Sequence, residues 1–264
     1  EMTGVTEQVG ADQNGITALA KLDLDEPQAW QATALMLVWP ASVALFLPYT
    51  ESLFLLLSVY CFYKAREGKF WLAGLLGALA TLTRQQGLFL ALPLAWEIWQ
   101  TSERRWSGAL RKSLPLVLMP AAYGLWIVYR AVAINDVHPD FSSLQTFIHT
   151  VMISPSSYEI TDQHAFLPPW LTVWRVMKVF WSGGAASDSY INVSLSVTFT
   201  GLFVLSWRYL RASYRVYSVA IFLIALSFYP GDINPLLALP RHLALAFPVF
   251  IGLAARYRLQ TVPF

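Results

Sequence analysis

The chain has 264 residues, of which 56% are hydrophobic and only 13% are charged. Because soluble domains carry about 25% charged residues, this composition argues against an ordinary soluble enzyme, and its apolar content excludes a disordered chain. The net charge of +2 is too small to indicate nucleic-acid binding. The single cysteine, Cys61, excludes a disulfide framework within the chain and a cysteine-based zinc cluster.

Eight nearly uncharged apolar segments follow one another along the chain. A membrane-spanning helix needs about 20 mostly apolar residues, and several segments approach that length. The expected spans are Trp30–Leu47, Ser52–Tyr63, Phe70–Thr83, Gly87–Trp99, Leu114–Ala133, Ile191–Trp207, Val216–Tyr229 and His242–Ala255. A soluble protein with buried helices is the alternative, but eight such runs leave too little polar surface to cover it. The sequence therefore predicts an all-α polytopic membrane bundle of about eight transmembrane helices.

The basic residues support this number of spans and give an orientation. If the eight spans alternate, 13 of the 18 Lys and Arg residues fall on one side, which the positive-inside rule makes cytoplasmic. They are Lys21, Lys64, Arg66, Lys69, Arg104, Arg105, Arg111, Lys112, Arg208, Arg211, Arg215, Arg256 and Arg258. The five exceptions are Arg84, Arg130, Arg175, Lys178 and Arg241, so the outer arginines need a separate explanation.

Four regions are expected along the chain. Residues 1–29 form a cytoplasmic connection or the remnant of an earlier helix, 30–133 a five-helix membrane region, 134–190 an outer loop and 191–264 a three-helix membrane region. Within the outer loop, Trp170, Trp174, Met177 and Trp181 recur at helical spacing after Pro168 and Pro169. This pattern is typical of an amphipathic helix lying in the membrane interface, and a short extra span is the alternative.

Three short outer turns carry the candidate polar residues. Tyr49 and Glu51 follow Pro48 and line an outward cavity, or Glu51 only favours the first turn of the next helix. Arg84 and Gln85, with Gln86, can bind a phosphate, since arginine forms two hydrogen bonds to one; snorkelling to the interface is the alternative. Arg241 and His242 can reach an anionic headgroup, or Arg241 only anchors the helix.

The long outer loop holds a further group of polar residues. Asp136, His138, Asp140, Asp162 and His164 lie in this loop, but their spacing is weak evidence for a metal site and favours a solvated loop. Asp140 stays a candidate carboxylate near a substrate. No metal or cofactor is expected, and the sequence lacks the phosphate-binding, zinc-protease, nucleophile-elbow and dinucleotide motifs. These absences argue against ATP-driven transport and most soluble hydrolase mechanisms.

Two stretches resemble a known family. Residues Pro48–Phe54 (PYTESLF), then Ala73–Arg84 (AGLLGALATLTR) with Gly87, resemble the PIG-V type of GPI mannosyltransferase and its bacterial relatives. Arg241 with Phe247 and Pro248 resembles the family's closing Arg…Phe-Pro element. The resemblance extends over about Ala18 to Arg258 and is most specific from Pro48 to Gly87. It implies a polytopic glycosyltransferase of the GT-C superfamily.

The resemblance implies transfer of mannose from a polyprenyl- or dolichyl-phosphate donor to an acceptor hydroxyl on the outer face, usually with inversion. Arg84, Gln85, Arg241 and His242 are then expected at the phosphate, and Tyr49 and Glu51 at the sugar or acceptor. The family's first outer loop is expected to carry a Trp-Asp pair, which this chain lacks. The chain therefore looks N-terminally truncated, with its catalytic base outside it and Glu51 or Asp140 as the fallback.

The expected partners are a lipid-phosphate-linked sugar, a glycolipid or glycoprotein acceptor and membrane lipids, without nucleic acid. The bacterial character of the resemblance favours a multi-pass protein of a bacterial inner membrane over one of the endoplasmic reticulum. Two other classes stay open. A lipid or small-molecule transporter would need polar groups at mid-membrane and broken helices in paired positions. A non-catalytic membrane subunit would need no base at all.

Overall fold

The computed structural model describes residues 15–47, 49–103, 105–129, 132, 165–184 and 186–257. In these ranges the protein is all-α apart from two short strands, and residues 15–20 begin it as a helix. The further helices are α2 (Glu26–Val38), η1 (Pro40–Phe46), α3 (Glu51–Arg66), α4 (Phe70–Thr83), η2 (Gln85–Leu90), α5 (Ala91–Thr101), α6 (Trp106–Ser113), η3 (Leu114–Val117), α7 (Leu118–Tyr129), α9 (Pro169–Trp181), α10 (Ser187–Ser206), η7 (Trp207–Tyr209), α11 (Ala212–Ser227), α12 (Leu239–Ala244) and α13 (Pro248–Arg256). Strands β1 (Ala165–Phe166) and β2 (Phe228–Tyr229) pair antiparallel, with Ala165 opposite Tyr229.

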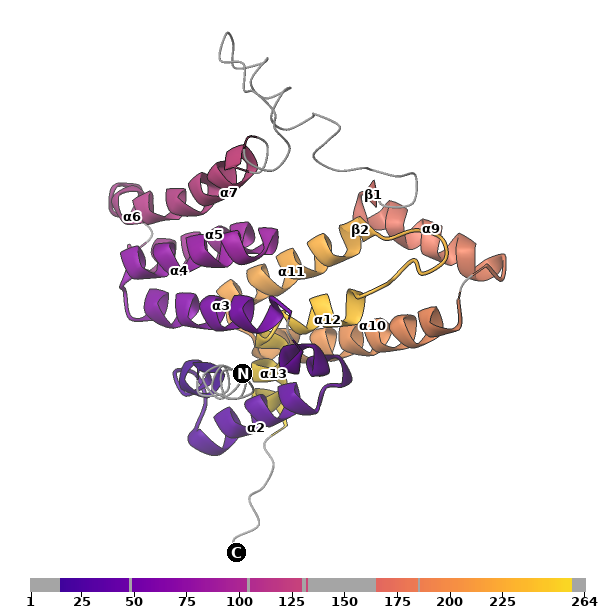
Figure 1. Cartoon of the computed structure of the whole chain (residues 1–264). Coiled ribbons are helices and arrows are strands. Elements are labelled where there is room, and N and C mark those ends of the chain that lie inside the picture. Colours follow the sequence, from indigo (N-terminus) through magenta and orange to yellow (C-terminus); the bar gives the residue numbers. More distant parts are fainter. Residues whose placement is uncertain are drawn as a thin grey trace, which may run out of the picture.

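The helices form two groups that α11 joins (Figure 1). In the first group α4 lies between α3 and α7, and α5 follows beside it. In the second, α13 packs against α2 and α10. Helix α11 contacts α5 from the first group and α12, α13 and α9 from the second. Its buried residues Tyr214, Tyr217 and Ile221 therefore belong to the core that both groups share.

Fewer helices than the eight expected could cross a membrane. Among the described residues, two are long and apolar enough, Trp106–Tyr129 and Ser187–Tyr209, and a third is possible if α2 and η1 form one span. The prediction of about eight continuous transmembrane helices is therefore wrong in number. The apolar segments exist as helices, but α4 has 14 residues and α11 has 16, which is short for a full crossing.

Proline explains two of the interruptions. The expected span Trp30–Leu47 is divided at Pro40, where α2 ends and η1 continues at an angle of 89°. The last expected span, His242–Ala255, is divided at Pro248, the first residue of α13. Proline has no backbone N–H to donate, and its ring collides with the preceding turn, which favours a break in the helix at these two positions. Hydropathy alone does not register these breaks.

Charged side chains join the predicted cytoplasmic ends of three helices. Arg66 of α3 donates to both carboxylate oxygens of Asp23, at 2.9 and 3.1 Å. Arg211, just before α11, lies 3.4 Å from the same carboxylate and 3.8 Å from Glu97 of α5. Glu97 is buried and accepts a hydrogen bond from Ser213. Two of the turns predicted to be cytoplasmic therefore lie close together.

Helix α9 has the two faces that the sequence predicts. Trp170, Trp174 and Trp181 are exposed, Trp181 by 95%, whereas Arg175 lies 5.5 Å over the ring of buried Tyr229. The helix thus turns its aromatic residues outward and its arginine toward the body of the protein. Its location in a membrane interface stays a prediction.

Small residues let α4 approach α7 closely. The backbone of Gly74 lies against Pro115, whose carbonyl oxygen would be 2.6 Å from an added Cβ, and Gly77 lies against the Met119 side chain. Thr81 is buried and donates to the Gly77 carbonyl oxygen at 2.8 Å. The small residues Gly74 and Gly77 therefore make this face of α4 a packing surface, which holds the end of α4 in place.

Replacing Gly74 by Ala should lower stability, since a backbone oxygen has no room to give way; overpacking of this kind costs about 1–3 kcal/mol. Gly124→Ala in α7 is the matched control, because nothing lies within 4 Å of its added Cβ. That change should be neutral or stabilise the helix by up to about 1 kcal/mol. Thermal unfolding in detergent can be followed by dye labelling of buried Cys61. Equal melting temperatures for the two variants would contradict the packing argument.

Candidate functional site

The predicted outer residues around Glu51 meet where α3 begins. Glu51 is the first residue of α3, as predicted, and its side chain is only 2% exposed. The hydroxyl of Ser52 donates to the Leu45 carbonyl oxygen at 2.7 Å, and Thr50 makes no side-chain cap. Neither hydroxyl therefore caps the helix. Instead, the turn from η1 into α3 buries a carboxylate.

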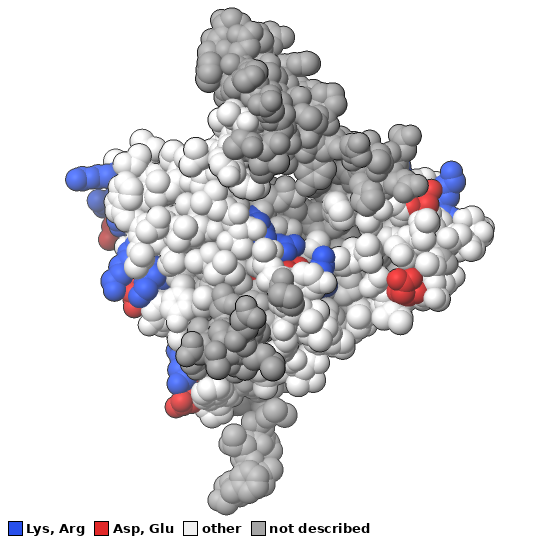
Figure 2. Space-filling model, viewed as in Figure 1, with Lys and Arg blue, Asp and Glu red and all other residues white. Residues whose placement is uncertain are grey.

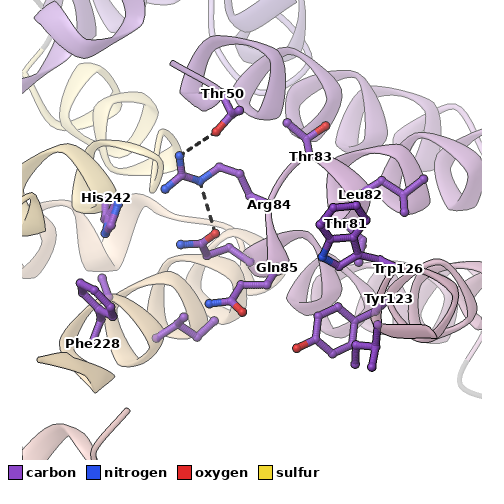
Figure 3. A pocket seen from close by; sticks show the side chains of 14 residues that line it. Thr50, Thr81, Leu82, Thr83, Arg84, Gln85, Tyr123, Trp126, Phe228 and His242 are labelled. Atoms are coloured by element: carbon purple, nitrogen blue, oxygen red, sulfur yellow. Dashed lines mark hydrogen bonds between the residues drawn. The ribbon is translucent and has the colours of Figure 1, made fainter. Parts of the chain in front are cut away.

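Arg84 reaches this carboxylate from the tight turn after α4. Its extended backbone (φ −151°, ψ 138°) ends α4, and its carbonyl oxygen accepts from the Gly87 N–H at 2.9 Å. A Cβ on Gly87 would overlap the backbone of Ala80 and Thr81, so only glycine permits this turn. The Arg84 guanidinium donates to Thr50 Oγ1 at 3.0 Å and to Gln86 Oε1 at 3.3 Å (Figure 3).

Arg241 approaches the same carboxylate from α12. This short helix starts after Ala238, which has a left-handed backbone (φ 65°). Arg241 Nε lies 3.5 Å from Glu51 Oε1, and its guanidinium lies 4.8 Å over the Tyr49 ring, a cation–π geometry. Segments that are almost 200 residues apart in sequence are thus joined through one carboxylate.

Glu51 is shared by two arginines but is poorly hydrogen bonded. Arg84 Nη1 lies 2.9 Å and Arg241 Nε 3.5 Å from Glu51 Oε1, yet neither contact has hydrogen-bond geometry. Among the described residues, both buried Glu51 oxygens lack a hydrogen-bond donor. Burial also lowers the pKa of Arg84, an effect that the charge of Glu51 opposes. A buried polar group left in this state is unusual in proteins.

A cavity of about 500 Å³ opens beside this cluster. We call it the Arg84 cavity. Its polar lining consists of Thr50, Thr81, Thr83, Arg84, Gln85, Gln86 and His242. Its apolar lining consists of Leu82, Tyr123, Trp126, Ile127, Ile224, Ala225 and Phe228. Figure 3 shows Arg84 on the side of Thr50 and His242, with Tyr123 and Trp126 across from it. The cavity therefore offers a polar end and an aromatic wall.

The charges of the cluster leave an excess of one positive charge. Arg84 and Arg241 carry two, Glu51 cancels one, and His242 is counted as neutral. Figure 2 shows a small group of charged residues near the centre of this face, away from the charged residues at the edges of the view. Charges act more strongly where water is displaced by apolar surroundings, so this excess favours a ligand with one negative charge.

The structure places the predicted site residues in two positions. Arg84, Gln85 and His242 line the Arg84 cavity. Glu51 and Arg241 lie behind them as ion-pair partners, and Tyr49, 49% exposed, supports Arg241 from outside the cavity lining. Asp140 lies outside the described residues, as do Asp136, His138, Asp162, His164 and Pro48.

Gln86 has a different role from the one predicted. It was expected to add a donor beside Arg84, but its Oε1 accepts from Arg84 Nε and its side chain is buried. Tyr123, Trp126 and Phe228, which supply the aromatic part of the cavity lining, were not predicted from the sequence. The spacing of Tyr123 and Trp126 puts both on one face of α7, a signal that could have identified them as a pair.

Replacing Glu51 by Gln should destabilise the protein, because two arginines would be left without their shared anion. Loss of one partner of a buried ion pair costs about 3–5 kcal/mol, and the partial exposure of Arg241 places the expected loss near the lower end. Glu103→Gln is the control, since Glu103 is 81% exposed and lies 3.9 Å from Arg105. It should cost less than about 1 kcal/mol. Thermal unfolding in detergent distinguishes the two, and equal stability would refute a structural role for the Glu51 cluster.

Within the described ranges, no group of three His, Cys, Asp or Glu side chains could hold a metal ion. No family model matches the chain, and no curated protein or solved structure matches it either. The residues of the Arg84 cavity are therefore the basis on which a function is proposed.

Proposed function

We propose that the protein is a membrane glycosyltransferase that moves mannose from a polyprenyl-phosphate donor to an acceptor hydroxyl on the outer face. The observation that carries the proposal is the composition of the Arg84 cavity. A single excess positive charge faces a space whose opposite wall is aromatic and aliphatic. A polyprenyl-phosphate sugar is a phosphodiester with one negative charge and an apolar chain, and it fits both parts of this lining.

Arg84 and His242 are the groups proposed to hold the phosphate. During transfer the acceptor oxygen attacks the anomeric carbon, and the bond from that carbon to the phosphate oxygen breaks. The phosphate then leaves as a monoester, which takes a second negative charge. Because Arg84 lies in the cavity lining and is held by Thr50 and Gln86, it is already oriented toward the charge that develops. Arg241 contributes its charge from behind and orients Glu51.

Glu51 is proposed as a positioning residue rather than as the base. The base must accept the hydroxyl proton of the acceptor, which requires a carboxylate that the acceptor can reach. Glu51 is 2% exposed, lies between two arginines and is not part of the cavity lining. We therefore assign the base to a residue outside the described ranges, with Asp140 as the candidate in this chain.

The function can be tested with the full-length protein in liposomes and radiolabelled polyprenyl-phosphate mannose, with membranes of the source organism as acceptor. Arg84→Gln should lower the turnover of the saturated enzyme about a hundredfold, the usual effect of losing one donor to a developing anion. Arg105→Gln, 79% exposed, should leave it unchanged. Unfolding temperatures of both variants show whether the effect is chemical or structural.

The same assay separates the proposed enzyme from its alternatives. If the intact protein forms no labelled product but moves the lipid between leaflets, the protein is a transporter. If it does neither and only retains the lipid, it is a binding subunit. Unchanged transfer by Arg84→Gln would remove Arg84 from the mechanism. One bent helix pair, α2 with η1, is present among the described residues, whereas a transporter with inverted repeats would carry such breaks in pairs.

A further inference from the structure

The Arg84 cavity borders α11 at Ile224 and Ala225, and a second hollow lies along α11 between Ala212 and Ile224. It has a volume of about 470 Å³, and its lining is almost wholly apolar. We call it the α5–α11 groove. Phe89, Leu92 and Trp96 line one side, and Val216, Leu223 and Ile224 line the other. Leu92 and Leu223 are about half exposed, so the groove opens to the outside of the bundle along its length.

One charged residue closes the predicted cytoplasmic end of this groove. Arg215 lines it, with its guanidinium 5.3 Å over the Trp207 ring, and Arg215 Nη2 donates to the Arg208 carbonyl oxygen at 3.3 Å. Arg215 Nε is buried and has no hydrogen-bond partner among the described residues. Aside from Arg215, the groove lining consists of apolar and aromatic residues. The groove thus combines an apolar channel with one incompletely bonded cation.

The charged end lies far from the Arg84 cavity. Arg215 and Ile224 are nine residues apart on α11, which corresponds to about 13 Å along a helix. Ile224 lines both hollows, whereas Arg84 and Arg215 each line only one. A polyprenyl-phosphate sugar whose phosphate lies at Arg84 cannot also place that phosphate at Arg215. The cation of the α5–α11 groove therefore calls for a headgroup of a different molecule.

We propose that the α5–α11 groove binds an anionic glycerophospholipid, with one acyl chain between α5 and α11 and the phosphate against Arg215. The lipid would come from the leaflet on the side where the basic residues gather, and Arg208 beside Arg215 adds a second, exposed positive charge. An apolar helix face from another protein would fill the channel but would leave the buried Arg215 Nε without an acceptor. A lipid phosphate satisfies both features, and this site does not depend on the glycosyltransferase proposal.

The inference can be tested by native mass spectrometry of the full-length protein, delipidated in detergent and then given phosphatidylglycerol or phosphatidylcholine of the same chain length. Arg215→Gln should reduce phosphatidylglycerol binding about tenfold, the usual effect of losing a charge-assisted hydrogen bond, and should abolish the preference for the anionic lipid. Leu223→Trp fills the groove from its exposed side and should weaken the binding of both lipids.

Arg256→Gln is the matched control. Arg256 also lies over an aromatic ring, 5.2 Å from Tyr257, and donates to a backbone carbonyl oxygen, but it lines no part of the groove. It should bind both lipids as the unchanged protein does. Equal binding of the two lipids, or an equal loss in Arg215→Gln and Arg256→Gln, would overturn the proposal. Displacement of phosphatidylglycerol by polyprenyl phosphate in an Arg215-dependent manner would also overturn the proposal, because the groove would then be a binding site for the sugar-lipid donor.

Discussion

The buried carboxylate of Glu51 is the constraint on which the arrangement of the candidate site depends. It begins α3, faces Arg84 at the end of α4 and faces Arg241 in α12, so three parts of the chain must come together for its charge to be tolerated. Removing a carboxylate from water is costly unless cations replace its hydration. Two cations are present, but their geometry leaves both oxygens without a hydrogen bond from the described residues. The carboxylate of Glu51 is therefore paired with two cations, but its oxygens lack hydrogen bonds from the described residues.

This combination suits a site that must hold an anion without binding it irreversibly. Two unopposed arginines in apolar surroundings would attract a phosphate strongly and would also repel each other. Glu51 reduces the excess to one charge and fixes the positions of both guanidinium groups. The turn at Gly87 and the packing of Gly74 against η3 and of Gly77 against α7 supply the rigidity that keeps Arg84 at the cavity. The small residues of α4 are thus part of how the site is positioned.

Much of this site could be predicted from the sequence, because its members are polar residues in short turns between apolar segments. Glu51, Arg84, Arg241 and His242 stand out for this reason, and the structure brings them together. The aromatic wall could not be recognised, since Tyr123, Trp126 and Phe228 lie among many other apolar residues and their function depends on tertiary packing. Similarly, the apolar segments predicted helices correctly, but the bend at Pro40 and the break at Pro248 changed which of them are long enough to cross a membrane.

Ile224 of α11 is part of the lining of both hollows. Ile224 borders both the Arg84 cavity and the α5–α11 groove, so a change of its rotamer would alter the shape of both. If an occupant of one hollow changes the affinity of the other, the linkage is reciprocal for binding affinities. Whatever factor a lipid in the groove applies to the affinity of the cavity for its ligand, the ligand applies the same factor to the lipid. The composition of the surrounding bilayer would thereby enter the affinity of the cavity.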